Sequence, residues 1–284
     1  MINKDTEFLI VGLGLIGGSY AKVLKAKGYK VNAIDTNDET IKFAMENKII
    51  DEGSVDSDSK LIGNADVIIL GLYPSLEVNW VKENQNKFKS GVLLSDVAGV
   101  KSCVVKDMQE TLREDAEFIA CHPMAGREVS GVKNSDPSVF KDANYIVVPT
   151  EKNTAEAIET AKEIGKILGF NKISELSVDK HDEIIGFVSQ LTHVIAISLM
   201  TCNEDENLEK YTGDSFRDLT RIARINEKMW SELFLENKEE LLNQIESFMS
   251  QMDYIKDLLE ESDRGRLEQV MIASTKRRAL FDKK

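Results

Sequence analysis

The sequence predicts an α/β protein in which a Rossmann-like, doubly wound parallel sheet is followed by an all-helical domain. Over the first 176 residues, short and almost continuously apolar runs alternate with helix-like segments. This pattern is typical of a parallel sheet covered on both faces. A glycine-rich turn joins the first apolar run to the first helix-like segment. From Ser177 onward only helical patterns follow, so we divide the chain into residues 1–176 and 177–284.

The apolar runs of the first part have the length of strands and end in turn residues. In chain order they read "EFLIVGLG", "KVNAIDT", "ADVIILGL", "GVLLSDVA", "AEFIACHP" and "ANYIVVPT", and "NKISELS" can add one more strand. The helical patterns between them are "SYAKVLKAKG", "DETIKFAMEN", "SCVVKDMQETLR" and "TAEAIETAKEIGKILG".

The second part contains two helical segments whose apolar surface needs a partner. Residues 181–200, "HDEIIGFVSQLTHVIAISLM", are apolar on nearly all sides, as expected of a helix buried in a core or an interface. Farther on, an apolar seam repeats at alternating spacings of four and three, formed by Leu241, Ile245, Phe248, Met252, Ile255 and Leu259. A long apolar helical half behind an α/β domain favours a homodimer.

Composition excludes several classes of function. The net charge is -13 and the isoelectric point is about 4.9, which argues against nucleic-acid binding. The amino-terminal apolar run is interrupted by glycines, and no uninterrupted apolar run reaches the roughly 20 residues of a membrane helix. We expect a cytoplasmic protein without a membrane segment. The three cysteines are widely spaced and form neither a disulfide framework nor a zinc pattern, so we expect no metal.

The glycine-rich turn has the spacing of a dinucleotide-binding site. Gly12 allows the tight turn, Gly14 lets the backbone approach a pyrophosphate, and Gly17 permits close packing of helix on strand. The residues that open the helix, Leu15 and Ile16, are assigned to the site through the amide donors of the helix N-terminus.

An acidic residue then selects the cofactor. Asp35 ends the second strand, 18 positions after Gly17, where a carboxylate accepts hydrogen bonds from ribose hydroxyls and repels a 2′-phosphate. No arginine follows it, so NAD is favoured over NADP.

Three further segments identify a family. The stretches "HPMAGREVSGV", "SQLTH" and "FRDLTRIARINEKMW", set behind the dinucleotide domain, resemble the prephenate/arogenate dehydrogenase family, the NAD(P)-dependent step of tyrosine biosynthesis. The resemblance covers essentially the whole chain. It implies a Rossmann-like domain with a helical dimerisation domain, and oxidative decarboxylation of prephenate to 4-hydroxyphenylpyruvate.

The implied reaction needs a proton acceptor. Hydride leaves the hydroxyl-bearing ring carbon, the ring carboxylate leaves as CO2, and the developing carbonyl must lose its proton. The resemblance makes His122 the catalytic histidine. Its position just past the carboxyl end of a strand is where open parallel sheets bind ligands, and a neutral imidazole suits the task.

The two substrate carboxylates need cations. The arginine of the family's T-R-I-A segment matches Arg221, and a guanidinium pairs bidentately with a carboxylate. Arg217 and Arg224 share its face if the segment is helical, and Arg127, directly after the H-P-M-A-G turn, is a further candidate. His193 matches a second family histidine near the substrate, whereas a histidine on an apolar helix is more commonly a core residue. Trp230 matches a family tryptophan that can equally be packing.

The chain departs from the family at one supporting position. The family often has D-x-x-S-x-K beside the nicotinamide, and this chain keeps Asp96, which we assign to the cofactor site, and Lys101, but has Gly99 for the serine. Either Ser102 or a water replaces that serine, or the site is tuned differently.

Three alternatives stay open. Arogenate differs from prephenate by an ammonium in place of a keto group, and the arginines and plain NAD signature favour prephenate. A 3-hydroxyacid dehydrogenase has a similar architecture but uses a lysine as acid and base, which would leave the H-P-M-A-G turn unexplained. A non-catalytic NAD-binding sensor would leave the arginines without a purpose.

Overall fold

The computed structural model describes residues 2–282. It divides into two compact units, a first that ends at Asn237 and a second that begins at Lys238. The first unit therefore contains the nucleotide domain together with the opening helices of the helical part.

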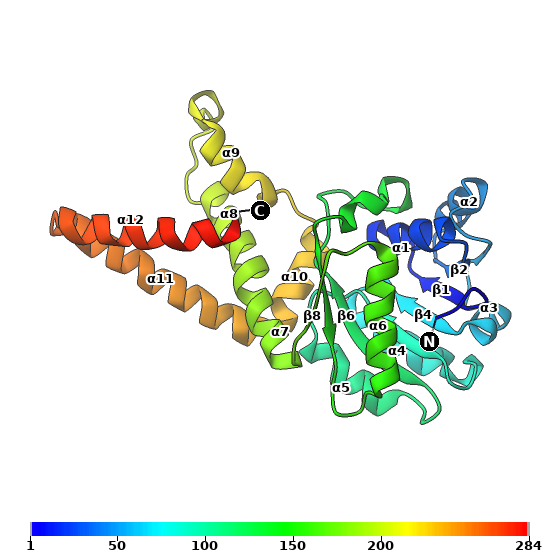
Figure 1. The fold of residues 1–284 in the computed structure, drawn as a ribbon. Helices are drawn as coiled ribbons and strands as arrows, with labels where there is room; N and C mark the ends of the chain where they lie inside the picture. Colours follow the sequence, from blue (N-terminus) through cyan, green and yellow to red (C-terminus); the bar gives the residue numbers. More distant parts are fainter. Residues whose placement is uncertain (1, 283–284) are drawn as a thin grey trace. The chain divides into compact units, whose positions relative to one another are not determined.

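An eight-stranded sheet lies at the centre of the first unit (Figure 1). Its spatial order is β3-β2-β1-β4-β5-β6-β7-β8. The strands are β1 (Glu7–Val11), β2 (Lys30–Ile34), β3 (Glu52–Ser54), β4 (Val67–Leu70), β5 (Leu93–Asp96), β6 (Glu117–Pro123), β7 (Asn144–Val148) and β8 (Lys172–Glu175). The short edge strand β3 has no apolar run and was not predicted.

The sheet is mostly, but not entirely, parallel. The strands β1 to β6 run in one direction, whereas β7 is antiparallel to β6 and parallel to β8. The reason lies in the connection, because β6 and β7 are joined by loops and short 3-10 turns instead of a crossover helix. The doubly wound sheet is confirmed for the strands that form the cofactor site.

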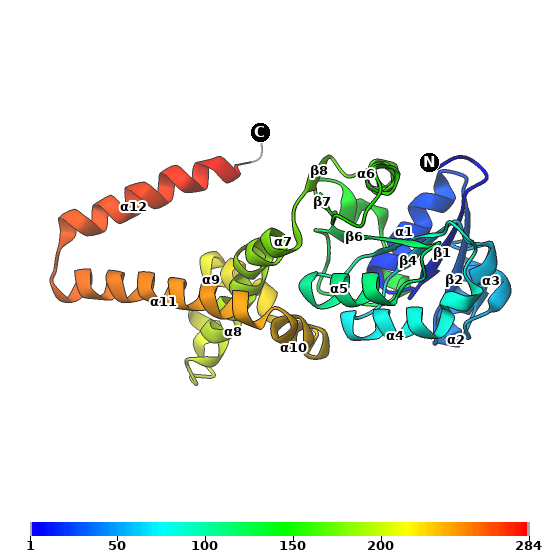
Figure 2. The same ribbon diagram turned by 90° about the horizontal axis from the view of Figure 1, so that it is seen from below.

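Helices cover both faces of this sheet, as Figure 2 shows. The helices α1 (Leu15–Ala26), α2 (Asp38–Glu46) and α6 (Ala155–Leu168) enclose one apolar core, and α3 (Ser59–Asn64), α4 (Pro74–Asn84) and α5 (Ser102–Thr111) enclose the other. Both cores use strand residues that are almost fully buried, such as Ile10 on one face and Ile68 on the other.

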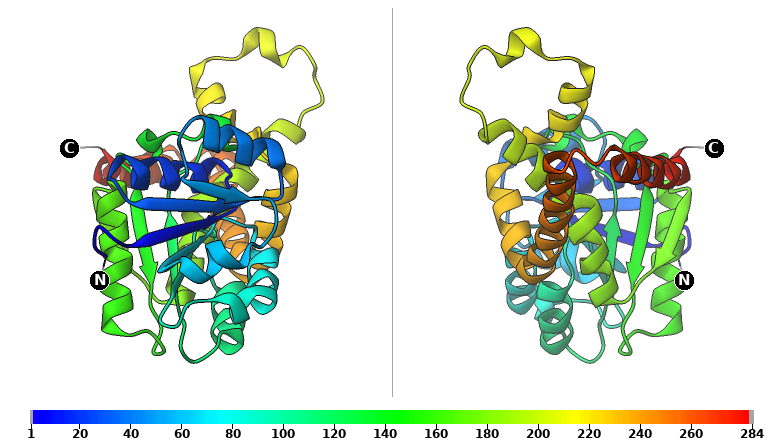
Figure 3. Two further views of the ribbon diagram at one scale, coloured as in Figure 1. Left: turned by 90° about the vertical axis from the view of Figure 1, so that its right-hand side faces the viewer. Right: turned by 90° about the vertical axis from the view of Figure 1, so that its left-hand side faces the viewer.

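The remaining helices of the first unit follow β8. They are α7 (Val178–Ile185), α8 (Thr192–Thr201), α9 (Asp214–Thr220) and α10 (Glu227–Glu236). A π-helical segment, Gly186–Leu191, separates α7 from α8, so the predicted single helix over residues 181–200 changes its winding midway. The polar stretch between α8 and α9 stands out as a loop (Figure 3).

Helix α10 packs over the turn between β4 and α4. Glu232 accepts a hydrogen bond from the backbone N–H of Ser75 at 2.9 Å, and Asn226 reaches the hydroxyl of Tyr73 at 3.5 Å. Because this turn lies at the carboxyl ends of the parallel strands, α10 forms one wall of the region where such sheets bind ligands.

The stretch Val178–Thr201 is long and apolar enough to cross a membrane, judged by length and composition alone. From the sequence we expected no apolar stretch of this length. The stretch meets the criterion because its charged residues occur only near its start. Its buried polar residues His181, Asp182 and Gln190 contact the nucleotide domain and α10, so the segment is part of the fold of the first unit. Only 28% of its apolar window is buried, and Phe187, Val188 and Met200 are exposed.

The second unit consists of α11 (Lys238–Glu260) and α12 (Arg264–Arg278). Asp263 caps α12 by accepting a hydrogen bond from the N–H of Arg266. Of the predicted apolar seam on α11, Met252 and Leu259 are exposed in the single chain. The seam is thus left open over these positions, as a surface that a second helix would cover.

Candidate active site

The glycine turn has the shape that a dinucleotide requires. Gly12 has φ of +91°, and a Cβ there would lie 2.5 Å from the carbonyl oxygen of Gly71, so only glycine fits. A Cβ on Gly17 would overlap the carbonyl oxygen of Gly12. Around Gly14, in contrast, a Cβ would meet nothing within 4 Å. The backbone at Gly14 is therefore open to a ligand, while the turn behind it is closed.

The other predicted cofactor residues surround this opening. Leu15 and Ile16 begin α1, and its N-cap, Gly14, offers no side chain to the helix amides. Those amides are thereby left for a phosphate group. Asp35 follows β2, and its carboxylate accepts hydrogen bonds from the N–H groups of Leu13 at 2.8 Å and Asn37 at 2.9 Å. It is held beside the glycine turn, at the place where a ribose would lie.

Asp96 differs from the other predicted cofactor residues because it is fully buried. One carboxylate oxygen accepts the N–H of Cys121 at 2.9 Å, and the other accepts the ammonium of Lys101 at 2.5 Å. Lys101 also donates to the carbonyl oxygens of Ala98 at 2.9 Å and Cys121 at 2.7 Å. The pair therefore fixes the end of β6, and Asp96 supports the site from beneath instead of facing a ligand.

His122 lies at the end of β6 and begins a chain of hydrogen-bonded side chains. Its Nδ1 is 2.9 Å from Nε2 of His181, and Nδ1 of His181 is 2.6 Å from Oδ1 of Asp182. Asp182 also accepts the backbone N–H groups of Lys101 and Ser102 and the hydroxyl of Ser102 at 2.5 Å. His181 and Asp182 are almost completely buried, whereas His122 is partly exposed.

This arrangement determines which nitrogen of His122 is free. Although burial opposes it, the hydrogen bonds from His181 and Ser102 lower the pKa of Asp182, which is an acceptor on both oxygens. Nδ1 of His181 must then be the donor, its Nε2 the acceptor, and Nδ1 of His122 the donor toward it. The remaining nitrogen of His122, Nε2, keeps its lone pair and can accept a proton.

Electrostatics keep His122 neutral. Burial, and after it His181 and the positive charge of Lys101, hold the pKa of His122 well below its usual value. Burial also lowers the pKa of His181, with Asp182 opposing that effect. A neutral imidazole with a free Nε2 is the form that a general base needs.

A second cluster gathers residues from the helical part. The rings of His193 and Trp230 are stacked, with centroids 3.6 Å apart, and Nδ1 of His193 donates to the carbonyl oxygen of Ser189 at 2.9 Å. Burial and the charge of Arg221 lower the pKa of His193, which leaves its Nε2 as an acceptor. Arg221 itself is largely exposed and forms an ion pair with Glu128.

The other predicted arginines have different surroundings. Arg217 pairs with Asp214 on the surface of α9, and Arg127 pairs with Asp136 and donates to Ser138. The expected shared helical face does not extend to Arg224, because α9 ends at Thr220 and a 3-10 turn over Arg221–Ala223 follows, so Arg224 is in extended conformation. Of the predicted arginines, Arg221 is the one whose charge also reaches His193.

Gly99 leaves room beside the histidine. A Cβ there would contact Leu233 of α10 at 3.6 Å and Cε1 of His122 at 3.9 Å, which are ordinary distances. The hydroxyl of Ser102 is not directed to His122 but to Asp182. Ser102 therefore contributes to the site through the His181–Asp182 pair.

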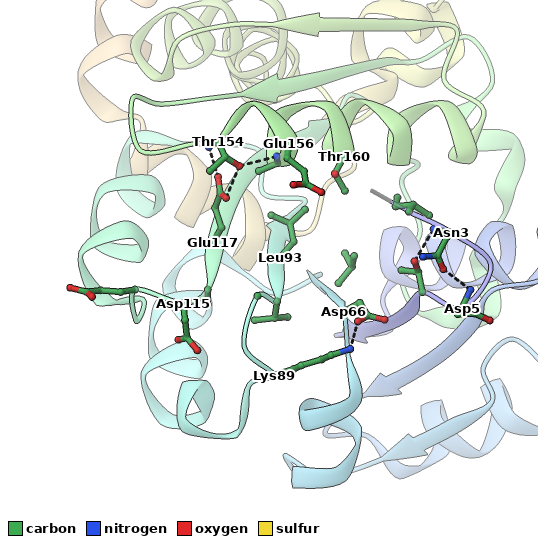
Figure 4. A pocket seen from close by; sticks show the side chains of 18 of the residues that line it. Asn3, Asp5, Asp66, Lys89, Leu93, Asp115, Glu117, Thr154, Glu156 and Thr160 are labelled. Carbon is green, nitrogen blue, oxygen red and sulfur yellow. Dashed lines mark hydrogen bonds and ion pairs between the residues drawn. The ribbon is translucent and has the colours of Figure 1, made fainter.

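A cavity of about 840 Å³ lies at the opposite edge of the sheet, at the amino ends of β4, β5 and β6 (Figure 4). Among its charged lining residues the acidic ones outnumber the basic ones, and they include Asp5, Asp66, Asp115, Glu117 and Glu156. It is separate from His122, and no function is assigned to it. Within residues 2–282 no group of His, Cys, Asp or Glu side chains is arranged to hold a metal.

Sequence reasoning gave no site role to three residues that contact the candidate residues. His181 was interpreted only as part of a helix N-terminus, and Asp182 and Glu128 were not considered. The sequence does contain a signal for His181 and Asp182, because they are polar residues at the start of a segment that is otherwise apolar and expected to be buried. No sequence pattern showed that this pair faces His122, 59 residues earlier.

A dinucleotide-binding turn with a neutral histidine at the carboxyl edge of the same sheet defines a nicotinamide-dependent dehydrogenase. Residues 20–172 match the profile of "Prephenate dehydrogenase, nucleotide-binding domain", and residues 177–273 that of "Prephenate dehydrogenase, dimerization domain". The chain belongs to the prephenate dehydrogenase family. The predicted family, the NAD-dependent oxidoreductase class and the fold are confirmed.

Individual relatives agree with this assignment. The prephenate dehydrogenase of Bacillus subtilis is 31% identical over 267 residues, covering 92% of this chain and 71% of that protein. The cyclohexadienyl dehydrogenase of Zymomonas mobilis is 26% identical over 277 residues, covering 91% and 94%. The crystal structure of the prephenate dehydrogenase of A. aeolicus, in complex with hydroxyphenyl propionate and NAD+, has a TM-score of 0.90 and 30% identity, covering 98% of each chain.

Proposed function

We propose that this protein oxidises prephenate with NAD and releases CO2 and 4-hydroxyphenylpyruvate. The observation that carries the proposal is the series of hydrogen bonds from His122 through His181 to Asp182 at the carboxyl edge of a dinucleotide-binding sheet, from which we infer a free Nε2 on His122. Bound NAD supplies the hydride acceptor for this chemistry. Family membership makes an oxidative decarboxylation of a cyclohexadiene the reaction to test first.

The residues have distinct roles in this proposal. His122 accepts the proton of the substrate hydroxyl at Nε2 as the carbonyl forms. Arg221 binds a substrate carboxylate, for which it exchanges its present partner Glu128. His193, stacked on Trp230, offers its Nε2 to the substrate as well. Arg127 and Arg217 are weaker candidates, since each already pairs with an aspartate.

The cofactor site fits NAD. The open backbone at Gly14 and the uncapped start of α1 at Leu15 and Ile16 would hold the pyrophosphate, and Asp35 would hold the adenosine ribose. A 2′-phosphate would be repelled by the Asp35 carboxylate. Asp96 would act indirectly, by fixing the strand end that carries His122.

We further propose a cytoplasmic homodimer. The dimerization-domain match over residues 177–273 supports a pairing of two chains. The exposed apolar residues Phe187, Val188 and Met200 of the helical part, and the open seam on α11, offer surface for it. Light scattering of the purified protein tests the dimer, which a monomer at micromolar concentration would exclude.

Arogenate is the alternative substrate, and the name of the Zymomonas relative is the reason to include it. The test is to mix the purified protein and NAD with prephenate or with arogenate, and to follow NADH absorbance. Faster turnover of prephenate supports the proposal, and faster turnover of arogenate replaces the substrate. If neither substrate reduces NAD while NAD still binds, the proposed function is wrong.

A further inference from the structure

His122, His181 and Asp182 form a continuous series of hydrogen bonds that leads from the edge of the sheet into the buried interior. Three hydrogen bonds follow one another. They join Nδ1 of His122 to Nε2 of His181 at 2.9 Å, Nδ1 of His181 to Oδ1 of Asp182 at 2.6 Å, and Oγ of Ser102 to Oδ2 of Asp182 at 2.5 Å. Each contact is within the distance over which a proton moves along a hydrogen bond.

The charges around the two imidazoles differ. His122 faces His181 and Lys101, and no carboxylate of the described chain is in hydrogen-bond contact with it. His181 faces Lys101 as well, but it contacts the Asp182 carboxylate directly and is within electrostatic range of Asp96. A positive charge is therefore better compensated on His181 than on His122.

Burial by itself opposes a positive charge on His181, so the Asp182 carboxylate has to compensate it. His181 and Asp182 expose almost none of their surface, and solvent does not compensate a charge on either of them. The Asp182 carboxylate is held by the amides of Lys101 and Ser102, and the carbonyl oxygen of Asp182 accepts a hydrogen bond from Asn237 at 3.0 Å. The counter-charge is thus fixed before the reaction begins, as electrostatic preorganisation requires.

We propose that the proton taken from the substrate hydroxyl does not remain on His122 but is stored on His181, opposite the fixed charge of Asp182. This inference rests on the proposed function. The O–H bond of the substrate breaks as the Nε2–H bond of His122 forms. The Nδ1–H bond of His122 then breaks as an Nε2–H bond forms on His181. The products of the relay are a neutral His122 and an imidazolium on His181 hydrogen-bonded to Asp182.

The storage has a chemical consequence. With His122 neutral, no positive charge remains next to the new carbonyl oxygen, which disfavours return of the proton. After product release the two transfers reverse, and Nε2 of His122 gives the proton to solvent. His181 acts through His122 and is a positioning and relay residue, while His122 is the catalytic residue.

Nuclear magnetic resonance of 15N-labelled histidine tests the resting state directly, because the chain has only three histidines. The spectrum is recorded on the NAD-bound protein during a pH titration, and His181→Gln and His193→Gln assign the signals. We expect His122 to carry its proton on Nδ1 at neutral pH, and His181 to become the imidazolium first as the pH falls. Protonation of His122 before His181, or a proton on Nε2 of neutral His122, would overturn the proposal.

Kinetics test the relay itself. In His181→Gln, the side-chain carbonyl can still accept a hydrogen bond from Nδ1 of His122 but cannot take up a proton. We expect kcat to fall at least about tenfold, with KM and the Kd for NAD within a factor of two. The dependence of kcat on the deuterium content of the solvent should change from curved to linear. An unchanged kcat would show that His181 only orients His122.

Asp182→Asn provides the matched change of charge. Removing the carboxylate lowers the proton affinity of the histidine pair, so the acidic limb of kcat/KM should move to lower pH. A structural defect alone would reduce kcat/KM equally at every pH and would contradict the proposal. Because the titration needs no turnover, failure of the proposed function, seen as absence of NADH formation by the native enzyme, is distinguishable from failure of the relay.

Discussion

The buried pair of Asp96 and Lys101 gives the most quantitative prediction, for the substitution Lys101→Met. Both side chains are fully buried, and the ammonium makes three hydrogen bonds, to Asp96 and to the carbonyl oxygens of Ala98 and Cys121. Methionine has a similar length and apolar stem but none of these donors. The substitution therefore leaves a buried carboxylate without its counter-charge.

The expected cost follows from that loss. Removing one partner of a buried ion pair typically costs about 3–5 kcal/mol. Two backbone carbonyl groups also lose a donor, which contributes to this cost. For a domain of this size about 2–4 °C of melting temperature correspond to 1 kcal/mol. The melting temperature should fall by about 6–20 °C.

Urea unfolding of the wild type, Lys101→Met, Asp96→Asn and the double variant measures this cost. The double variant has no uncompensated charge, so it should be more stable than the sum of the single changes predicts, by about 0.5–3 kcal/mol. A loss below about 1 kcal/mol in Lys101→Met, or strict additivity of the two changes, would refute the reasoning.

Three further predictions concern the cofactor site and one buried acid. Gly17→Ala should unfold at a lower urea concentration than wild type because its Cβ overlaps the carbonyl oxygen of Gly12. Gly14→Ala should keep its stability to urea and lose affinity for NAD, measured by fluorescence titration. If the two variants changed stability and NAD affinity equally, this interpretation would be contradicted. Asp35→Ser should raise the NADP to NAD ratio of kcat/KM, and an unchanged ratio would remove Asp35 from the ribose site. Burial, and after it the charge of Asp96, raise the pKa of Glu77, whose carboxylate oxygens have no hydrogen-bond partner. Because the pKa of Glu77 is higher in the folded state than in the unfolded state, folding becomes less favourable as the pH rises above the pKa of the unfolded state. The stability of Glu77→Gln relative to wild type should therefore increase between pH 5 and 8, by at most about 1.4 kcal/mol per pH unit. A difference that is constant with pH would contradict the buried-acid interpretation.

Sequence reasoning succeeded where a feature is local. The strands were visible as short apolar runs, and the glycine turn was visible because Gly12 and Gly17 have no sterically possible substitute. The place of Asp35 beside the glycine turn was predictable because a fixed spacing along the chain corresponds to a fixed place in a βαβ unit, and its ribose contact stays a prediction. His122 and Arg221 were assigned through motifs that a family shares, and their roles stay predictions.

The reasoning was weaker where a feature depends on contacts between distant segments. Asp96 was expected at the cofactor, but its partners Lys101 and Cys121 enclose it. Arg224 was expected on a common helical face, and the change to a 3-10 turn after Thr220 prevented that. The reversed direction of β7 follows from a loop whose path the hydrophobic pattern does not encode.

The sequence by itself thus determined the class of fold, the cofactor turn and the family, because each of these depends on residues that are close together in the chain. Only the tertiary structure decided the hydrogen bonding of His122. The free nitrogen of His122 is set by His181, and the donor role of His181 is set by Asp182, 60 residues from His122 in the chain. Proton positions depend on distances of about 3 Å between side chains, and such distances exist only once the sheet and the helix α7 have packed together.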